Sequence, residues 1–471
     1  MLKEQTAAPT AAAPSLGTTS LDAEVSIDAL DVEGTLPSWL EGTLIRNGPA
    51  RFEAGGRSVR HWFDGLAMLH RFAIADGSVA YSNRFLRTKA YAAAEKGRIG
   101  YREFATDPCR SLFSRLTAMF SPGITDNAAV NVARSGEEFI AMSETPMPIV
   151  FDPRTLETIG AAEQPPGQLP TAHPHVDPQT GELINLAVHL GPRSSYRIYA
   201  DSPGGGRRVL STIPVREPAY LHSFGLTERF VVLAFGPLVV NPLKLAVGGK
   251  PFIENYRWEP ERGSEFIAVD RSSGEVAKRW TGDPLFLFHH INAYEEGDEI
   301  VVDLCGYDDA QLIEDLYLDR MRADGDIAQS RPRRYRLPLD GDVAEWETLA
   351  DVELELPRID PRRNGRRHSV AWGTSRHDDA FGSAVARVDV DDGGVTQWHE
   401  PGCNPGEPVF IPRPDGTAED DGVLLSVVLD TNAGRSFLLA LDAATLEEVA
   451  RAGLPHHVPL GIHGQFFEEL T

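Results

Sequence analysis

One turn pattern recurs along this chain and constrains its fold more than any other feature. An Asp, often after an apolar residue, opens a turn rich in Pro, Gly, Ser or Thr, and a strand-like run follows. Such turns begin at Asp76, Asp152, Asp177, Asp270, Asp340, Asp391 and Asp442. An Asp side chain accepts hydrogen bonds from backbone N–H groups just beyond it, which suits turns between antiparallel strands. The pattern predicts a protein built mainly of β-hairpins.

The spacing of these turns is irregular, from 25 to 93 residues, so the chain is not a strict repeat. Hairpins spread along 471 residues with little helical interruption favour small sheets repeated around an axis, which is a β-propeller. A pair of β-sandwiches is the alternative that the pattern leaves open.

The chain is expected to form one domain over residues 21–471, because no long Pro/Gly/Ser-rich linker interrupts that range. Residues 1–20 are rich in Ala, Pro, Thr and Ser and are expected to be a disordered tail. A hydrophobic fraction of 42% supplies a sizeable core. No apolar run reaches the ~18 residues that a membrane span requires, and we find no secretory signal near the first residue.

The formal charge of −24, from 45 Lys and Arg against 69 Asp and Glu, disfavours nucleic acid as a partner. Cys109, Cys305 and Cys403 are far apart and odd in number, so they predict no disulfide framework. We therefore expect a reducing, cytoplasmic compartment.

Four of the 14 histidines stand among apolar or small residues, close to predicted strands: His173 in TAHPHVD, His222 in YLHSFGLT, His289 in FLFHHINAYE and His463 in GIHGQFF. Their intervals of 49, 67 and 174 residues do not fit a zinc finger or an HExxH motif. A propeller could still bring them together, since the innermost strand of every blade lies beside the axis. Neutral imidazoles suit Zn, Cu, Fe or Ni.

A histidine that binds a metal usually donates its second N–H, often to a carboxylate. Candidates in apolar or Pro/Gly surroundings are Glu144 in AMSETPMP, Glu355 in ELELPRID and Glu407 in NPGEPVFIP. A Glu close to Pro is also a common turn residue, and the residues alone leave both interpretations open.

Several longer motifs occur in a recognisable order: GTLIRNGPARF (42–52), HWFDGLAMLHRF (61–72), TDNAAVNV (125–132), the segments around Glu144 and the four histidines, and GEPVFIPRPDGTAEDDGVLLSVVLD (406–430). With them the sequence resembles the carotenoid cleavage oxygenase family over most of its length. DPCRSLFSR (107–115) is most similar to the animal-type branch, which holds β-carotene oxygenases and a retinoid isomerase. One departure is Gly65-Leu66-Ala67-Met68, where the family usually has Gly-Asp-Gly-Met.

The resemblance implies an all-β, seven-bladed β-propeller with helices and loops capping one face and an Fe(II) ion on its axis. By motif, the iron ligands would be His173, His222, His289 and His463, and the carboxylates that orient three of them would be Glu144, Glu355 and Glu407. The family's histidine matches His173 rather than His175, and His289 rather than His290. We expect His175 and His290 to be structural, and His61 and His70 to be core or cap residues.

The resemblance also implies an activity, in which O₂ is used to split one C=C bond of a carotenoid or apocarotenoid into aldehydes. Central 15,15′ cleavage is the specific expectation. Tyr220 is the candidate catalytic residue, with its ring against the polyene, and a packed core aromatic is the alternative. Ser143 stands where stilbene-cleaving relatives carry a Lys, which disfavours a stilbene. A retinoid isomerohydrolase and a non-enzymatic pigment-binding propeller remain alternatives, and the oligomeric state is open.

A carotenoid substrate resides in lipid, so we expect peripheral association with a membrane. Segment 111–120 has apolar residues at helical spacing, and segment 235–249 is an apolar stretch interrupted by prolines. The side chains expected to form an exposed apolar patch are Leu112, Phe113, Leu116, Met119, Phe120, Leu238, Val239, Val240 and Leu243. Ordinary core is the alternative for both segments.

Overall fold

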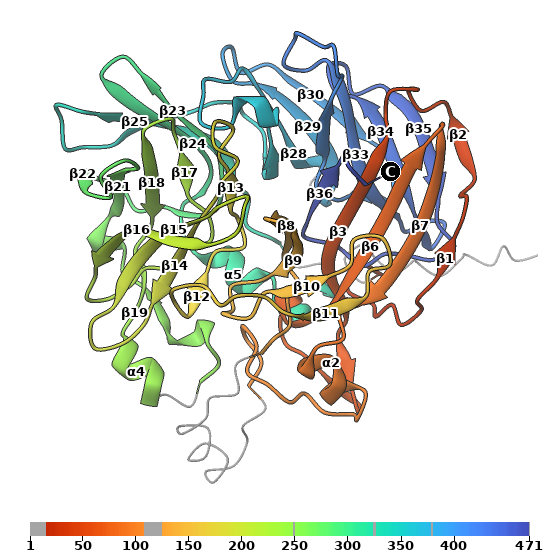
Figure 1. Ribbon diagram of the computed structural model, residues 1–471, viewed down its shortest axis with the longest axis horizontal. Helices are drawn as coiled ribbons and strands as arrows, with labels where there is room; N and C mark the ends of the chain where they lie inside the picture. The colour runs from red at the N-terminus through yellow and green to blue at the C-terminus, as the bar shows by residue number, and fades with distance from the viewer. Residues whose placement is uncertain (1–15, 108–124, 248–249, 324–325, 378–379, 471) are drawn as a thin grey trace, which may run out of the picture.

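The computed structural model describes residues 16–107, 125–247, 250–323, 326–377 and 380–470. Within these ranges, seven antiparallel sheets of four to six strands are arranged around a common axis (Figure 1). The prediction of a seven-bladed β-propeller is confirmed, and the alternative of two sandwiches is wrong. The reason is that each sheet packs its two faces against the two neighbouring sheets around the axis, as blade 4 does with blades 3 and 5, whereas a sandwich packs one sheet against a single partner.

The first four blades follow the chain from its N-terminal part. Blade 1 contains β36 (His463–Phe467), β3 (Gly42–Arg51), β6 (Leu66–Ala75), β7 (Ser78–Phe85) and β1 (Ser26–Ile27). Blade 2 contains β8 (Asn131–Ser135), β9 (Glu138–Met142), β10 (Ile149–Phe151) and β11 (Thr158–Ala161). Blade 3 contains β12 (Leu169–Pro170), β13 (His175–Val176), β14 (Leu183–His189), β15 (Ser195–Asp201) and β16 (Arg207–Pro214). Blade 4 contains β17 (Gly225–Leu226), β18 (Phe230–Phe235), β21 (Ser264–Asp270) and β22 (Val276–Gly282).

The last three blades complete the ring. Blade 5 contains β23 (Phe286–Glu296), β24 (Glu299–Tyr307), β25 (Arg331–Pro338) and β26 (Glu345–Thr348). Blade 6 contains β27 (Glu355–Arg358), β28 (Val370–His377), β29 (Ala380–Asp389) and β30 (Val395–His399). Blade 7 contains β31 (Cys403–Pro405), β32 (Val409–Pro412), β33 (Gly422–Asp430), β34 (Arg435–Asp442), β35 (Glu448–Gly453) and β2 (Val32–Gly34). Two short ribbons, β4 (Glu53–Ala54) with β5 (Arg57–Ser58) and β19 (Leu238–Val240) with β20 (Tyr256–Trp258), lie outside the blades.

Two strand pairs close the ring. The C-terminal strand β36 pairs with β3, placing His463 opposite Asn47. The N-terminal strand β2 pairs with β35 of blade 7. Strands from the two ends of the chain thus share blade 1 and blade 7, with β36 and β2 as edge strands, and this sharing closes the ring.

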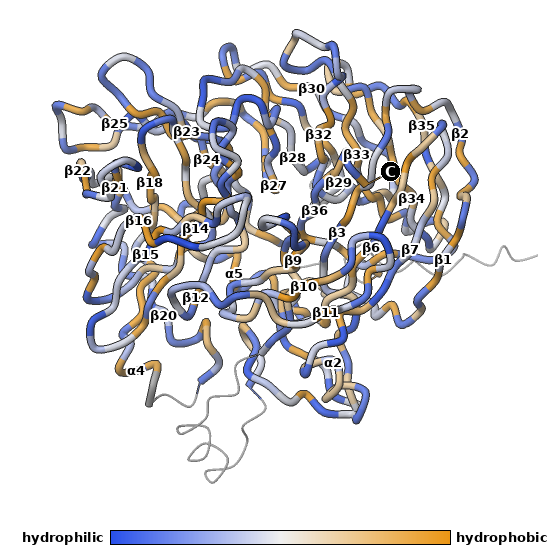
Figure 2. Tube along the Cα trace, in the orientation of Figure 1, coloured by the Kyte–Doolittle hydropathy of each residue, from blue (hydrophilic) through white to orange (hydrophobic). Residues whose placement is uncertain are grey.

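The buried strands explain the continuous apolar runs in the sequence. In β18, Val231, Leu233 and Phe235 pack into the cluster shared with blade 3. Phe230 and Val232 point the other way, into the cluster shared with blade 5. A central blade strand is covered on both faces, so both sets of alternating positions are apolar. Figure 2 shows hydrophobic residues following such strands, while hydrophilic residues mark many outer loops.

The predicted Asp turns form at several of the expected positions. Asp152 Oδ1 accepts hydrogen bonds from the N–H groups of Arg154 and Thr155, and Asp270 and Asp442 bind their own turns in the same way. In DDGGV the turn is held by Asp389, the last residue of β29, and not by Asp391. The strand therefore ends two residues earlier than the pattern indicated.

Short helices and loops inserted between strands cover one face of the ring. They include α2 (Lys89–Ala94), α4 (Pro242–Val247), α5 (Gln311–Asp315), α6 (Leu318–Met321), η1 (Trp62–Asp64) and η2 (Ile253–Asn255), with η3 (Pro260–Arg262) and η4 (Pro361–Arg363) elsewhere. Leu312 and Met321 of these insertions share one apolar cluster with Tyr220 and Phe288 of the propeller. The cap therefore joins the propeller through an apolar layer.

The predicted apolar patch is only partly as expected. Segment 111–120 lies outside the described residues. Leu238, Val239 and Val240 are buried, because β19 pairs with β20 and their side chains enter the apolar clusters. The prediction that they are exposed is wrong. Leu243 in α4 is 66% exposed, as expected. No described helix is long and apolar enough to cross a bilayer.

The last residues of the predicted N-terminal tail lie against the body of the protein. Thr18 is buried, and its carbonyl accepts a hydrogen bond from Arg322. The carbonyl of Gly17 accepts one from the N–H of Leu460. The attached part of the chain thus begins before residue 21.

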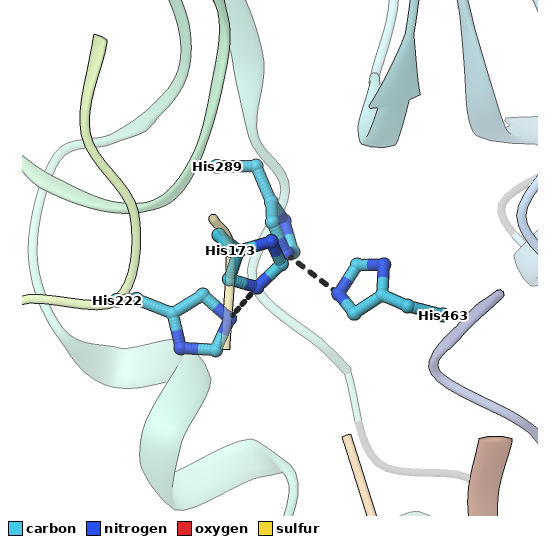
Figure 3. A group of neighbouring side chains, drawn as sticks. All are labelled: His173, His222, His289 and His463. Atoms are coloured by element: carbon cyan, nitrogen blue, oxygen red, sulfur yellow. Dashed lines mark hydrogen bonds between the residues drawn. The ribbon is translucent and has the colours of Figure 1, made fainter. Parts of the chain in front are cut away.

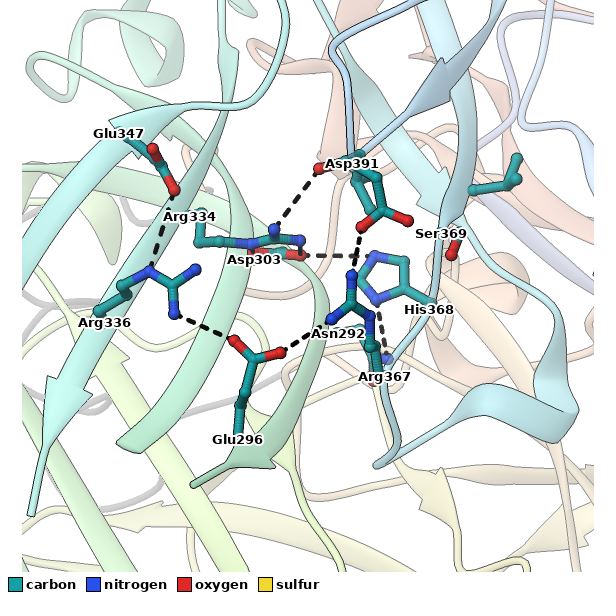
Figure 4. A network of polar contacts seen from close by, with 12 residues as sticks. Asn292, Glu296, Asp303, Arg334, Arg336, Glu347, Arg367, His368, Ser369 and Asp391 are labelled. Atoms are coloured by element: carbon teal, nitrogen blue, oxygen red, sulfur yellow. Dashed lines mark hydrogen bonds and ion pairs between the residues drawn. The ribbon is translucent and has the colours of Figure 1, made fainter. Parts of the chain in front are cut away.

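A polar network fastens blade 5 to blade 6 (Figure 4). Asp303 of β24 is fully buried and forms a two-pronged ion pair with Arg334 of β25, with the nearer N···O distance at 2.7 Å. His368, which precedes β28, lies 3.5 Å from the same carboxylate. Arg367 bridges Glu296 of blade 5 and Asp391 of blade 6. An arginine side chain can bind a carboxylate through two N–H groups at once, which fixes its orientation. The network therefore holds blades 5 and 6 in a fixed relative position.

Candidate metal centre

The four predicted histidines meet at the axis, each from a different blade. His173 lies in the loop before β13, His222 lies just before β17, His289 is part of β23, and His463 begins β36. Their candidate ligand atoms all lie within 4.8 Å of one another. Figure 3 shows the four rings turned toward a common point.

Three of the rings are held from behind by the three predicted glutamates. His222 Nδ1 donates to Glu144 at 2.6 Å, and His463 Nδ1 donates to Glu407 at 2.7 Å. His289 Nδ1 donates to Glu355. Among the described residues, no carboxylate holds His173. A hydrogen on Nδ1 leaves the lone pair on Nε2, and in each ring Nε2 is the atom that faces the centre.

The geometry of the facing nitrogens fits a cation. The Nε2 atoms of His289 and His463 are 3.2 Å apart, and both rings carry their hydrogen on Nδ1. Two lone pairs therefore face each other, which is favourable only when a positive centre lies between them. The Nε2 atoms of His173 and His222 are 3.0 Å apart. Borderline nitrogen ligands suit a divalent transition metal.

Burial keeps the imidazoles of His173, His289 and His463 neutral by lowering their pKa values. Desolvation holds the pKa of His173 and of His289 well below the usual value, and neighbouring histidines lower both further. Desolvation also lowers the pKa of His463 to about 3, although Glu407 opposes the shift. A neutral imidazole offers the lone pair that a metal requires.

Irregularities in two strands aim the site residues. The pairing of β23 with β24 shifts register between Leu287 and His290, and that of β27 with β28 shifts between Glu355 and Arg358. An extra residue in a strand re-aims side chains locally. In β23 the bulge separates two adjacent histidines, because His289 faces the axis while His290 bonds to Ser223.

A further layer of donors holds the glutamates. The hydroxyl of Tyr220 donates to Glu144 at 3.0 Å, and that of Tyr307 donates to Glu355 at 2.9 Å. Glu407 instead binds two arginines, Arg46 and Arg358. Sequence reasoning missed Tyr307 and both arginines as site residues. Arg46 stands in the RNGPARF motif, which was the available signal.

The two types of donor, a tyrosine hydroxyl and a pair of arginines, leave Glu355 and Glu407 with different pKa values. Burial raises the pKa of Glu355 to about 7, because the hydroxyl of Tyr307 and the N–H of Leu356 only partly compensate for lost solvent. Burial would also raise the pKa of Glu407, but Arg358, His463 and Arg46 hold it well below the usual range. Glu407 is therefore a firmly ionised partner of its histidine.

The other histidines lie outside the cluster. His175 bonds to Asn364 and to the carbonyl of Phe224. His61 contacts the carbonyl of Ile313 in the cap, and His70 bonds to Tyr81. The choice of His173 over His175 and of His289 over His290 agrees with this placement.

An apolar pocket opens beside the histidines, under the cap. Its lining includes His222, His289, Trp62, Phe63, Phe288, Leu312, Leu316, Phe381 and Ile462. Tyr220 is not among the lining residues in the described part of the chain. Its ring instead packs against Phe104, Tyr256, Phe286 and Phe288, and its hydroxyl points at Glu144. The contact with Glu144 is the one that the sequence did not predict.

Comparison with known proteins places the chain in one family. The family model described as retinal pigment epithelial membrane protein matches residues 18–468. The chain belongs to this family, the carotenoid oxygenases, as its motifs predicted.

Curated relatives cover nearly the whole chain. A carotenoid isomerooxygenase of Galleria mellonella is 36% identical over 482 residues, which cover 93% of both chains. The β,β-carotene 15,15′-dioxygenase of Homo sapiens is 32% identical and covers 93% of this chain and 92% of its own. The carotenoid-cleaving dioxygenase, mitochondrial, of Homo sapiens is 34% identical and covers 92% and 87%.

Solved structures show the same architecture. A variant of the Synechocystis apocarotenoid oxygenase superimposes with a TM-score of 0.87 and 28% identity, covering 98% of this chain and all of its own. The cobalt-substituted form of the Synechocystis enzyme gives 0.87 and 28%, covering 97% and 98%.

Proposed function

We propose that this protein is an Fe(II)-dependent oxygenase that splits one C=C bond of a carotenoid or apocarotenoid. The observation that carries the proposal is the set of four imidazole Nε2 atoms that converge beside an apolar pocket, three of them oriented by carboxylates. Such a site needs neither a nucleophile nor an acid–base pair. The curated relatives named as carotenoid dioxygenases support the substrate class.

Each part of the site has a distinct task in this proposal. His173, His222, His289 and His463 hold the iron, and Glu144, Glu355 and Glu407 fix the orientation of three of these rings. Bound Fe(II) would supply the electrons that allow O₂ to react with the polyene. Phe63 and Phe288 in the pocket exclude water and bind the apolar chain. The reaction balances, since both atoms of O₂ enter the two carbonyl groups formed from one C=C bond.

Tyr220 contributes as a positioning residue. Its hydroxyl donates to both oxygens of Glu144, which in turn holds His222. Its ring completes the aromatic layer behind Phe288. In this role Tyr220 acts through Glu144 and supports the site without touching the polyene.

The cleaved bond is proposed to be the central 15,15′ bond, as in the named activity of the 15,15′-dioxygenase relatives. Separate incubations with β-carotene, a hydroxylated carotenoid, an apocarotenal and a retinyl ester under ¹⁸O₂, read by mass spectrometry, test both the reaction and the bond. Retinal carrying ¹⁸O, formed only by iron-loaded protein, is the expected result. Label-free retinol from a retinyl ester, with no cleavage of any carotenoid, would instead identify an isomerohydrolase.

A further inference from the structure

The ligand histidine on the closing strand is held differently from the other three. His463 has a carboxylate partner, Glu407, as two other ligands do. Arg46 of β3 and Arg358 of β27 both bind this carboxylate. The N–H of Gly464 donates to it as well, at 3.0 Å. Glu407 therefore accepts from four donors, while the hydroxyls of Tyr220 and Tyr307 are the corresponding side-chain donors of Glu144 and Glu355.

The two arginines also hold the backbone on either side of the ligand. A second nitrogen of Arg46 donates to the carbonyl of Ile462 at 3.1 Å. A second nitrogen of Arg358 donates to the carbonyl of Gly464 at 2.5 Å. Both carbonyls that flank His463, and its carboxylate partner, are thus fixed by the same two guanidinium groups. The planar guanidinium group of arginine has several N–H donors at fixed angles and can make such a set of contacts. The single ammonium group of lysine cannot.

We call Arg46, Arg358 and the groups that they bind the arginine clamp. This clamp joins parts of the ring that are far apart in the sequence. Arg46 comes from blade 1, Arg358 from blade 6 and Glu407 from blade 7. The bulge in β27 lets Glu355 and Arg358 both contact the site from one short strand. Close packing at Gly464 supports the arrangement, because a Cβ there would lie 2.5 Å from Arg46 Cδ.

We infer that Arg46 and Arg358 are positioning residues that fix the His463 imidazole for the metal, and that they act through geometry and not through charge. This inference rests on the proposed metal site. The direct effect of charge would be the opposite, since a cationic arginine near the centre repels a divalent ion. The arginine charges also keep Glu407 ionised, so a lysine, which keeps the charge and loses the planar guanidinium group, separates geometry from charge.

Cobalt(II) is a suitable probe because its absorption spectrum reports the coordination geometry without turnover. Arg358 is the better position to change, since its side chain is 21% exposed and less buried than that of Arg46. Arg387→Met is the matched control. Arg387 belongs to the same blade, is 17% exposed and pairs with Asp420 at 2.7 Å, away from the centre.

We expect Arg358→Met and Arg358→Lys to lose cobalt to a chelator 10–100-fold faster than the wild type, which is the usual effect of losing an orienting partner. Both variants should also show an altered cobalt spectrum, while Arg387→Met should match the wild type. The inference is overturned if Arg358→Lys behaves as the wild type, or if Arg358→Met retains cobalt more tightly than the wild type. Arg358→Lys carries the test if the Met variant does not fold. A wild type that binds no cobalt would refute the proposed site itself, a result distinct from failure of the clamp.

Discussion

Glu144, in the turn between β9 and β10, accepts a hydrogen bond of 2.6 Å from Nδ1 of His222, which lies just before β17. The two residues belong to blades 2 and 4, with the whole of blade 3 between them in the sequence. Side chains from non-adjacent blades can meet in this way only at the axis. The contact thus depends on the closed ring and on no local motif.

The ligand set predicts a sharp contrast between neighbouring histidines. His222→Ala or His289→Ala should remove most of the bound iron and all carotenoid cleavage, because each deletes one of four converging nitrogens. His175→Ala and His290→Ala should keep the iron, since these rings bond to Asn364 and Ser223 instead. Iron content by elemental analysis after gel filtration measures the difference. Full iron occupancy in His222→Ala would contradict the assignment.

Removing the charge of an orienting carboxylate should weaken iron binding without abolishing it. Glu144→Gln, Glu355→Gln and Glu407→Gln each replace an anionic acceptor of an imidazole N–H by a neutral amide. Loss of such a partner typically lowers metal affinity or activity by 10–100-fold. Iron affinity by competition with a chelator, together with circular dichroism to verify folding, measures the effect. Wild-type affinity in all three variants would show that these residues are ordinary turn glutamates.

Membrane association is predicted to depend on apolar side chains outside the propeller. Leu243 in α4 is 66% exposed, and Leu243→Asp should reduce flotation with neutral liposomes. Phe113→Asp, in the segment outside the described residues, tests the other half of the predicted patch. Val343→Asp is the control, since Val343 is 59% exposed on blade 5. Binding of the wild type to anionic liposomes should persist or strengthen as salt rises, because salt screens the repulsion between anionic lipid and the protein's charge of −24. Equal flotation of all four proteins would exclude the patch.

Asp64 predicts a dependence of stability on pH. Burial raises the pKa of this carboxyl to about 6, and hydrogen bonds from Thr106 and Ala105 only partly offset the effect. Between the unfolded value near 3.8 and the folded value, the folded protein binds more protons than the unfolded chain. The stability that Asp64 contributes is therefore complete below about pH 4 and is lost as pH rises through about 6, by about 3 kcal/mol. Asp64→Asn removes this dependence.

Unfolding of the wild type and of Asp64→Asn between pH 4 and pH 8 measures the difference. The wild type should lose stability relative to the variant as pH rises. A difference that stays constant over this range, or that changes in the wild type's favour, would contradict the raised pKa.

The sequence predicted those features that a short motif contains. His173 and His289 could be chosen over their neighbours because family motifs distinguish adjacent positions, and the structure aims these two rings at the axis. The partners that hold the glutamates could not be chosen. Tyr307 and Arg358 stand in ordinary strand sequence, and only the closed ring and the bulge in β27 bring them to Glu355 and Glu407.

Burial was the other feature that pattern reasoning could not supply. The apolar run Leu238–Val240 has the same composition whether it faces lipid or core. Its pairing with β20, some 15 residues further on, decides the matter. The tail boundary is a similar case, because Thr18 is ordered by Arg322, a contact between opposite parts of the chain.

The position of His463 on the closing strand has a consequence for synthesis. A ribosome adds this residue only after the strands of the other six blades have been made, and β3, its pairing partner, is among the first strands to emerge. The nascent chain must therefore keep an open edge on β3 until β36 has been made. A chain that ends before residue 463 would contain the strands of six complete blades, a first blade without β36, and three of the four histidines.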